Sequence, residues 1–265
     1  MDKSMTISQH LEDLRKRVFR SVIVIGIISF FILSFHLTPF TYNGIKLYYP
    51  TFSPFDNMAA QATISMKHHL LPSTVQLIQT APGQAFFSQF YIAILLGIVF
   101  SMPVIVKEFV GFLAPALHRK EIQIIRNITI PAIILFIIGG LFSYFFVTPY
   151  ILGFLYKYGQ SADLLTFLNI MDFITFVLQF ILAFGVSFQL PLIMYALTAS
   201  GLIDPKFWRN NIRYAIIAMV ILGAAITPDG SGVTMWFVAV PMIVLYLIGM
   251  IVSERQVKNI GTLKS

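Results

Sequence analysis

Residues 233 to 252 read VTMWFVAVPMIVLYLIGMIV, twenty residues without a charged side chain. A helix of this length rises about 30 Å, the thickness of the hydrocarbon core of a bilayer. Five further apolar runs precede it, and together the runs predict membrane-spanning helices over 18–36, 86–107, 127–149, 171–198, 213–227 and 233–252. The sequence therefore predicts an all-α polytopic membrane protein of six spans, in a single domain covering residues 1–265.

The fifth run is shorter than the others. Only about thirteen apolar residues follow one another there, below the roughly 17 expected of a spanning helix, so its flanks must snorkel or the bilayer must thin. Prolines lie within four other runs, at positions 103, 131, 191 and 241. Each removes a helix hydrogen bond, so we expect kinked spans and a curved bundle.

The basic residues give the predicted spans an orientation. With six spans, fifteen of the eighteen Lys and Arg residues fall on the side of the N-terminus, and only Lys46, Lys67 and Lys157 fall opposite. Basic residues favour the cytoplasmic side, so both termini are predicted to be cytoplasmic in a multi-pass protein of the cell membrane. The net charge of +7 then needs no nucleic acid to explain it, and the basic clusters suit anionic lipid head groups.

The connecting segments are uneven. About fifty residues separate the first two runs, rich in Pro and aromatic residues and poor in charge, and we expect short helices and turns packed over the outer ends of the spans. Asn169 and Asp172 are spaced like a capping box at the start of the fourth run. Asp204 before Pro205 predicts a helix start ahead of the fifth. Asp229 is interpreted as a turn residue.

Catalytic and ion-coupling signatures are missing from the sequence. We find no nucleophile elbow, no zinc-protease pair and no phosphate-binding glycine loop, so the chain is not expected to be an enzyme or to hold a metal or cofactor. No predicted span carries a charge at its centre, which argues against the alternative of a small-solute transporter or channel. The most notable polar group at depth is Gln189, for which the residues alone favour a helix–helix hydrogen bond.

Acidic residues stand among the basic ones on the predicted cytoplasmic side. One stretch reads HLEDLRKR from His10 to Arg17, and another reads FLAPALHRKE from Phe112 to Glu121. The residues alone favour i,i+4 ion pairs on a solvated helix end, Glu12 with Lys16 and Asp13 with Arg17, each contributing about 0.3 to 0.5 kcal/mol. Orientation by itself requires only the cations.

Together with AFGVSFQLP from Ala183 and ITPDGSG from Ile226, these stretches resemble the motifs of the TatC family in order and spacing. That family is the multispan subunit of the twin-arginine protein translocase. The resemblance implies a receptor at the cytoplasmic face for signal peptides with two consecutive arginines, carried by folded cargo, with export driven by the proton gradient. It also implies single-span partner subunits of the TatA and TatB type. A structural scaffold without a substrate is the other alternative.

The resemblance assigns roles to individual residues. The family's signal-peptide acids fall on Asp13 and Glu121, and its intramembrane Glu or Gln falls on Gln189. Two adjacent guanidiniums require two carboxylates close together, because each planar fork pairs with one acid. The other matching positions of the motifs are Arg15, Phe112, Pro115, Leu117 and Lys120.

Some positions depart from the family pattern. Asp13 stands where glutamate is usual, Gln84 stands for a common glutamate, and Tyr91 replaces a usual lysine. An outer Glu–Lys pair therefore cannot be carried over to this chain. Gln189 stands where many members have glutamate, so a titratable group within the membrane is not required.

Overall fold

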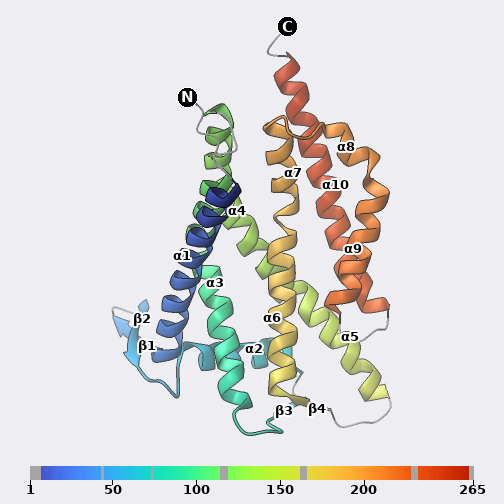
Figure 1. Ribbon diagram of the computed structural model, residues 1–265. Coiled ribbons are helices and arrows are strands. Elements are labelled where there is room, and N and C mark those ends of the chain that lie inside the picture. The colour runs from blue at the N-terminus through green and yellow to red at the C-terminus, as the bar shows by residue number, and fades with distance from the viewer. Residues whose placement is uncertain are drawn as a thin grey trace. The chain divides into compact units, whose positions relative to one another are not determined.

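The computed structural model of the chain describes residues 7–42, 45–72, 75–113, 119–161, 166–227 and 232–262 (Figure 1). The chain forms two compact units. The first comprises Met1–His10, Val106–Val147 and Gln179–Ser265, and the second comprises Leu11–Ile105 and Thr148–Leu178.

Five helical stretches are long and apolar enough to cross a bilayer, which confirms the prediction of a polytopic helical membrane protein. A shorter apolar helix, α9 (Ile212–Ile226), has fifteen residues and coincides with the short fifth run. At 1.5 Å per residue it rises about 22 Å, so its crossing of the bilayer stays a prediction. The five long stretches are Ser8–Ser34, Gln84–Phe109, Ile128–Lys157, Ile170–Ala199 and Val233–Gln256.

The helices extend beyond the predicted apolar boundaries. Helix α1 (Ile7–Ser34) already includes the charged motif, and α3 (Gln84–Leu113) and α10 (Val233–Thr262) also run past their apolar cores. Helix α4 (Arg119–Phe142) continues through the π-turn η2 (Ser143–Val147) into α5 (Thr148–Ser161). Hydropathy marks where hydrocarbon ends, whereas a helix continues as long as its backbone bonds are made.

In the first unit, α10 is the central packing element. It contacts α7 (Leu190–Ala199), α9 and the short helix α8 (Pro205–Asn210), and α4 also packs against α7 (Figure 1). The π-turn η2 (Ser143–Val147) extends α4. Helix α8 begins at Asp204, whose Oδ1 accepts a bond from the Lys206 N–H at 2.8 Å, so this predicted cap is confirmed.

In the second unit, a β-hairpin follows α1 directly. Strand β1 (Phe35–Tyr42) pairs antiparallel with β2 (Ile45–Phe52), and β1 contacts helix α2 (Met58–Leu70). The same unit contains α5 (Thr148–Ser161), which packs against α2. A short strand, β3 (Gln76–Ile78), pairs parallel with β4 (Phe167–Asn169), the strand that leads into α6 (Ile170–Ser187).

These strands correct the prediction of an all-α fold. Helix α2 agrees with the expected short helices of the outer segment, but β1, β2 and β3 do not. Prolines usually indicate turns, but Pro39 and Pro50 lie within β1 and β2. Pro is tolerated on an edge strand because no partner requires its missing N–H. The Phe, Tyr and Thr residues around them have high strand propensity.

The fourth predicted span is two helices. Helix α6 ends at Ser187, and α7 begins at Leu190 with Pro191 in its first turn. Pro191 has no N–H to continue the preceding helix, so the chain breaks here rather than bending. Pro103, Pro131 and Pro241 lie inside α3, α4 and α10, as predicted.

Helices α4 and α6 approach each other through two glycines. A Cβ atom on Gly139 would lie 2.6 Å from the backbone oxygen of Phe184, and one on Gly185 would lie 2.8 Å from the ring of Phe136. Each glycine thus accommodates a part of the opposite helix that a methyl group would displace. Small residues permit such close packing between membrane helices, where dispersion replaces the hydrophobic effect.

We therefore expect Gly139→Ala to destabilise the protein by about 1 to 3 kcal/mol, because the backbone atom it would meet cannot move away alone. The matched control is Gly153→Ala in α5, where the added methyl would meet no atom within 4 Å beyond its chain neighbours and the backbone of its own helix. That change should be neutral or stabilising, since Ala is the better helix former. Unfolding by SDS in mixed micelles measures both. Equal stability of the two variants would contradict this packing.

Candidate functional site

The charged motif of α1 forms the ion pairs predicted from its spacing. Lys16 Nζ lies 2.8 Å from Glu12 Oε1, and Arg17 Nε donates to Asp13 Oδ2 at 2.7 Å. The two pairs differ in exposure: both side chains of the first are 64% exposed, whereas Asp13 is 25% and Arg17 23% exposed. Only the Asp13–Arg17 pair is sheltered enough to contribute more than a surface pair.

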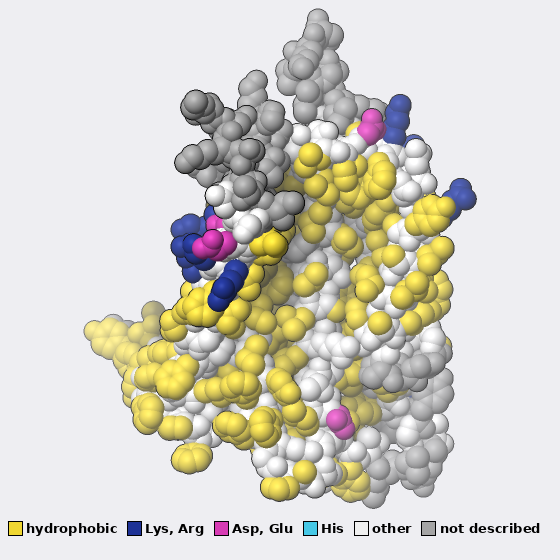
Figure 2. Space-filling model, viewed as in Figure 1, with side chains coloured by type: hydrophobic (Ala, Val, Ile, Leu, Met, Phe, Trp, Pro, Cys, Tyr) yellow, Lys and Arg dark blue, Asp and Glu magenta, His cyan; other side chains and the backbone are white. Residues whose placement is uncertain are grey.

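The apolar face of this motif is turned outward. Leu11 and Val18 are 60% and 52% exposed, more than twice the exposure of Asp13. Figure 2 shows the acidic and basic side chains at the N-terminal end of α1, beside yellow apolar surface. Both predicted ion pairs are present, but Glu12 and Lys16 are solvated, whereas Asp13 and Arg17 are partly buried. This arrangement is typical of a helix that enters a membrane with its apolar side toward lipid.

The two charged motifs meet at their first residues. The ring of His10 stacks on that of Phe112 near the end of α3, with centroids 4.3 Å apart and planes at 22°. Asp13 follows His10 by three residues in the same helix, which is less than one turn. Arg15, the other predicted residue of α1, is exposed.

Part of the predicted site lies outside the described residues. Pro115 and Leu117 belong to the connection between α3 and α4. Lys120 and Glu121 lie in the first turn of α4, but their side chains are outside the described part of the chain. The approach of Glu121 to Asp13 therefore stays a prediction.

The Gln189 side chain forms hydrogen bonds at the break between α6 and α7. Its own N–H bonds to the Val186 carbonyl, one residue short of the regular helical acceptor at Gly185. The Gln189 side-chain Nε2 donates instead to Gly185 O at 3.4 Å and to Ala132 O of α4 at 3.1 Å. The predicted helix–helix hydrogen bond is confirmed, and the same amide also satisfies a carbonyl that the helix break leaves without its usual donor.

A neutral cluster holds the segment ahead of α3. Gln84 Oε1 accepts bonds from the N–H of Thr80 at 2.9 Å, from that of Ala81 at 3.3 Å and from Asn169 Nδ2 at 3.2 Å. The amide oxygen of Gln84 thus binds this loop without a charged group. Asn169 Oδ1 also accepts from the Met171 N–H at 2.8 Å, which confirms its predicted cap, while Asp172 is exposed in the first turn of α6.

The sequence motifs did not single out Glu254 of α10, which pairs with a distant arginine. Arg209 of α8 binds Glu254 through two bonds, Nε to Oε1 at 2.9 Å and Nη2 to Oε2 at 2.7 Å. This is the planar fork expected of guanidinium and carboxylate. The signal that would have found it is Glu254 beside Arg255, an acid again placed among cations.

Comparison with known proteins identifies the family. The profile described as "Sec-independent protein translocase protein (TatC)" matches residues 9–241. The chain belongs to the TatC family. It is 57% identical over 252 residues to the TatC protein of Cenarchaeum symbiosum (strain A), covering 95% of this chain and 96% of that protein. The protein is therefore a membrane component of the twin-arginine translocase, as its motifs indicated.

More distant TatC proteins agree along nearly the whole chain. The protein of Aquifex aeolicus (strain VF5) is 32% identical over 253 residues, covering 94% of this chain and 95% of that protein. A crystal structure described as "Twin Arginine Translocase Receptor- TatC" has a TM-score of 0.75 at 28% identity, covering 92% of this chain and 98% of that one.

We expect Gln189→Met to lower the free energy of unfolding by about 1 kcal/mol, because two carbonyls lose their donor without a change in side-chain volume. The matched control is Gln179→Met, the same substitution at an exposed position of α6. This control substitution should change the free energy of unfolding little. Unfolding in mixed micelles gives both values, and an equal loss at 179 and 189 would show that the hydrogen bonds of Gln189 are not stabilising.

Proposed function

We propose that this TatC protein is the receptor that binds twin-arginine signal peptides at the cytoplasmic face of the cell membrane. The main support for this proposal is the stack of His10 on Phe112, which places the first residues of the two motifs with the proposed acids in contact. In this proposal Asp13 and Glu121 each bind one arginine of the peptide, and Arg15, Phe112, Pro115, Leu117 and Lys120 surround them.

The pairing of Asp13 supports guanidinium binding at this position. In the free protein its carboxylate accepts a bond from Arg17 Nε, at 25% exposure. On binding, the guanidinium of a peptide arginine would therefore take the place of the Arg17 guanidinium at the Asp13 carboxylate. Because the carboxylate is paired before and after this exchange, most of the cost of burying an unpaired charge is avoided.

The two ion pairs alone give selectivity rather than tight binding. Charge-assisted bonds contribute about 1.5 to 3 kcal/mol when partly desolvated and about 0 to 1 when exposed. The apolar segment of a signal peptide supplies the rest, at about 25 cal/mol per Å² buried against the spans or lipid. Gln189 would meet a polar group of the peptide as it inserts further, since only its Nε2 is used in the two bonds described.

The proposed topology has six spans, with α9 as the fifth and both termini in the cytoplasm. It rests on the distribution of fifteen Lys and Arg residues against three. Single-span TatA- and TatB-type subunits are the proposed partners, with the short α9 as a docking edge, and the proton gradient is the proposed energy source.

We expect Asp13→Asn and Glu121→Gln each to weaken binding of a twin-arginine peptide by at least about 1.5 kcal/mol, roughly tenfold in Kd, through loss of a charge-assisted pair. For a peptide with lysines in place of the arginines, the affinities of wild type and variants should differ much less, because lysine cannot form the same forked pair with a carboxylate. Fluorescence anisotropy of labelled peptides with the solubilised protein measures the affinities.

The control for Asp13→Asn is Glu12→Gln, which removes the neighbouring acid of the exposed pair and should leave the affinity unchanged. Equal affinity of wild type and Glu121→Gln for the arginine peptide would refute the two-acid site. A scaffold or a small-solute transporter would bind neither peptide.

The exchange of guanidiniums makes a second prediction. Arg17→Gln should raise the affinity for the twin-arginine peptide about two- to fivefold, because the competing partner of Asp13 is removed. Lys16→Gln removes the same charge but frees Glu12 instead, so it controls for the change in net charge. If the two variants bind the peptide equally, Asp13 does not exchange Arg17 for a peptide arginine.

A further inference from the structure

The hairpin β1–β2 carries apolar side chains on both of its faces. Its register places Tyr42 opposite Ile45 on one face and Pro39 opposite Tyr48 on the other. Figure 2 shows this hairpin as an area of yellow side chains at the lower left. A two-stranded sheet without a buried face is at best marginally stable in water. The large side chains of the hairpin that are 44% exposed or more are Phe40, Tyr42, Ile45, Leu47, Tyr48, Tyr49 and Phe52.

The exposed surface of the hairpin continues that of a membrane-spanning helix. Phe31 in the last turn of α1 stacks on Phe35 of β1 with centroids 4.5 Å apart, and Phe35 contacts Phe52 of β2 edge-on at 6.0 Å. Phe31 and Phe52 are themselves 42% and 72% exposed. This row of rings therefore joins the exposed apolar side of α1 to the hairpin.

The charge of the hairpin fits a lipid surface. Residues 35 to 52 contain no Asp or Glu, and Lys46 is their one Lys or Arg residue. Aromatic rings prefer the boundary between head groups and acyl chains, and a lysine beside them extends toward phosphate. A soluble partner would cover one face, whereas the interface of a bilayer surrounds both.

The open edges of the hairpin are unsuited to another strand. Gln61 of α2 bonds to Leu37 twice, accepting from its N–H at 3.1 Å and donating to its carbonyl at 3.0 Å, so Leu37 faces the open edge of β1. Residues two apart face the same way, which places Pro39 on that edge, and Pro50, opposite Leu37, on the edge of β2. Because proline has no N–H, pairing with a second copy is blocked on both edges.

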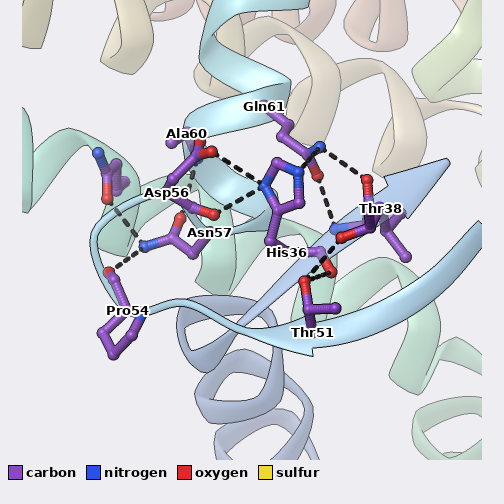
Figure 3. A network of polar contacts seen from close by, with 10 residues as sticks. His36, Thr38, Thr51, Pro54, Asp56, Asn57, Ala60 and Gln61 are labelled. Atoms are coloured by element: carbon purple, nitrogen blue, oxygen red, sulfur yellow. Dashed lines mark hydrogen bonds and ion pairs between the residues drawn. The ribbon is translucent and has the colours of Figure 1, made fainter.

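A polar network joins the base of the hairpin to α2 and to the segment before it (Figure 3). His36 Nδ1 lies 2.8 Å from the Asp56 backbone oxygen, and Thr38 Oγ1 bonds to Thr51 Oγ1 at 2.7 Å. The buried Asn57 donates to Pro54 O and to Gln89 Oε1 of α3. These bonds hold the base of the hairpin, from His36 to Thr38, against α2 and the segment before it.

The unpaired backbone N–H and C=O groups on the two edges limit how deeply the hairpin can enter the bilayer. Unpaired peptide groups cannot lie in hydrocarbon, but they can bond to water and head groups at the interface. We propose that the hairpin β1–β2 is a lipid-binding element that lies in the head-group region of the bilayer at the end of α1. Its aromatic side chains contact the acyl boundary, and Lys46 contacts lipid phosphate.

The natural absence of cysteine makes this testable by site-specific labelling. The variants Tyr42→Cys and Tyr48→Cys of the full chain would each carry an NBD label in vesicles of phosphatidylcholine and phosphatidylglycerol. Gln79→Cys, at an exposed polar position between β3 and α3, is the matched control. Quenching is measured with a nitroxide on the lipid head group and with iodide on both sides of the membrane.

We expect the head-group nitroxide to quench labels 42 and 48 at least about twofold more than label 79, and iodide to quench them less. Iodide quenching equal to that of label 79 would overturn the proposal. So would protection that rises with the protein-to-lipid ratio without nitroxide quenching, since that result indicates a second copy. The two labelled positions lie on opposite faces, so a misfolded variant at one leaves the other informative.

Discussion

A polar or charged group next to hydrocarbon needs a partner within the protein, because no water is present to solvate it. This constraint accounts for the pairing of Asp13 with Arg17, the least exposed charges of the α1 motif. It also accounts for Gln189, whose amide satisfies a carbonyl at the break between α6 and α7 and another on α4. Asp13 and Gln189, two of the groups proposed to bind a signal peptide, are therefore already bonded in the free protein, and their binding to a peptide is an exchange of partners.

Close packing between helices places these partners within reach. Gly139 and Gly185 let α4 and the end of α6 approach so closely that the Phe184 carbonyl and the Phe136 ring occupy the space that a Cβ atom would need. Ala132, the acceptor for Gln189, lies on α4 two turns before Gly139. A wider spacing of α4 from α6 would separate Gln189 Nε2 from that carbonyl, so the packing and the polar contact depend on each other.

The sequence predicts most of the helical fold because apolar runs and basic flanks are local signals. The i,i+4 pairs of α1 and the caps at Asn169 and Asp204 were predictable for the same reason. Contacts between distant segments were not: Arg209 and Glu254 are 45 residues apart, and Gln84 meets Asn169 across 85. The hairpin was missed because Pro39 and Pro50 indicate turns in isolation, and only pairing shows that both face open edges.

In the proposed receptor, two segments, one on α1 and one after α3, bind the same pair of arginines. The direct test is photo-crosslinking from a probe beside the arginines of a bound signal peptide, with the crosslinked residues mapped by mass spectrometry. We expect crosslinks both within residues 9–20 and within residues 112–125, and we expect them to disappear when lysines replace the arginines. Crosslinks confined to one of these segments, or unchanged with the lysine peptide, would contradict it.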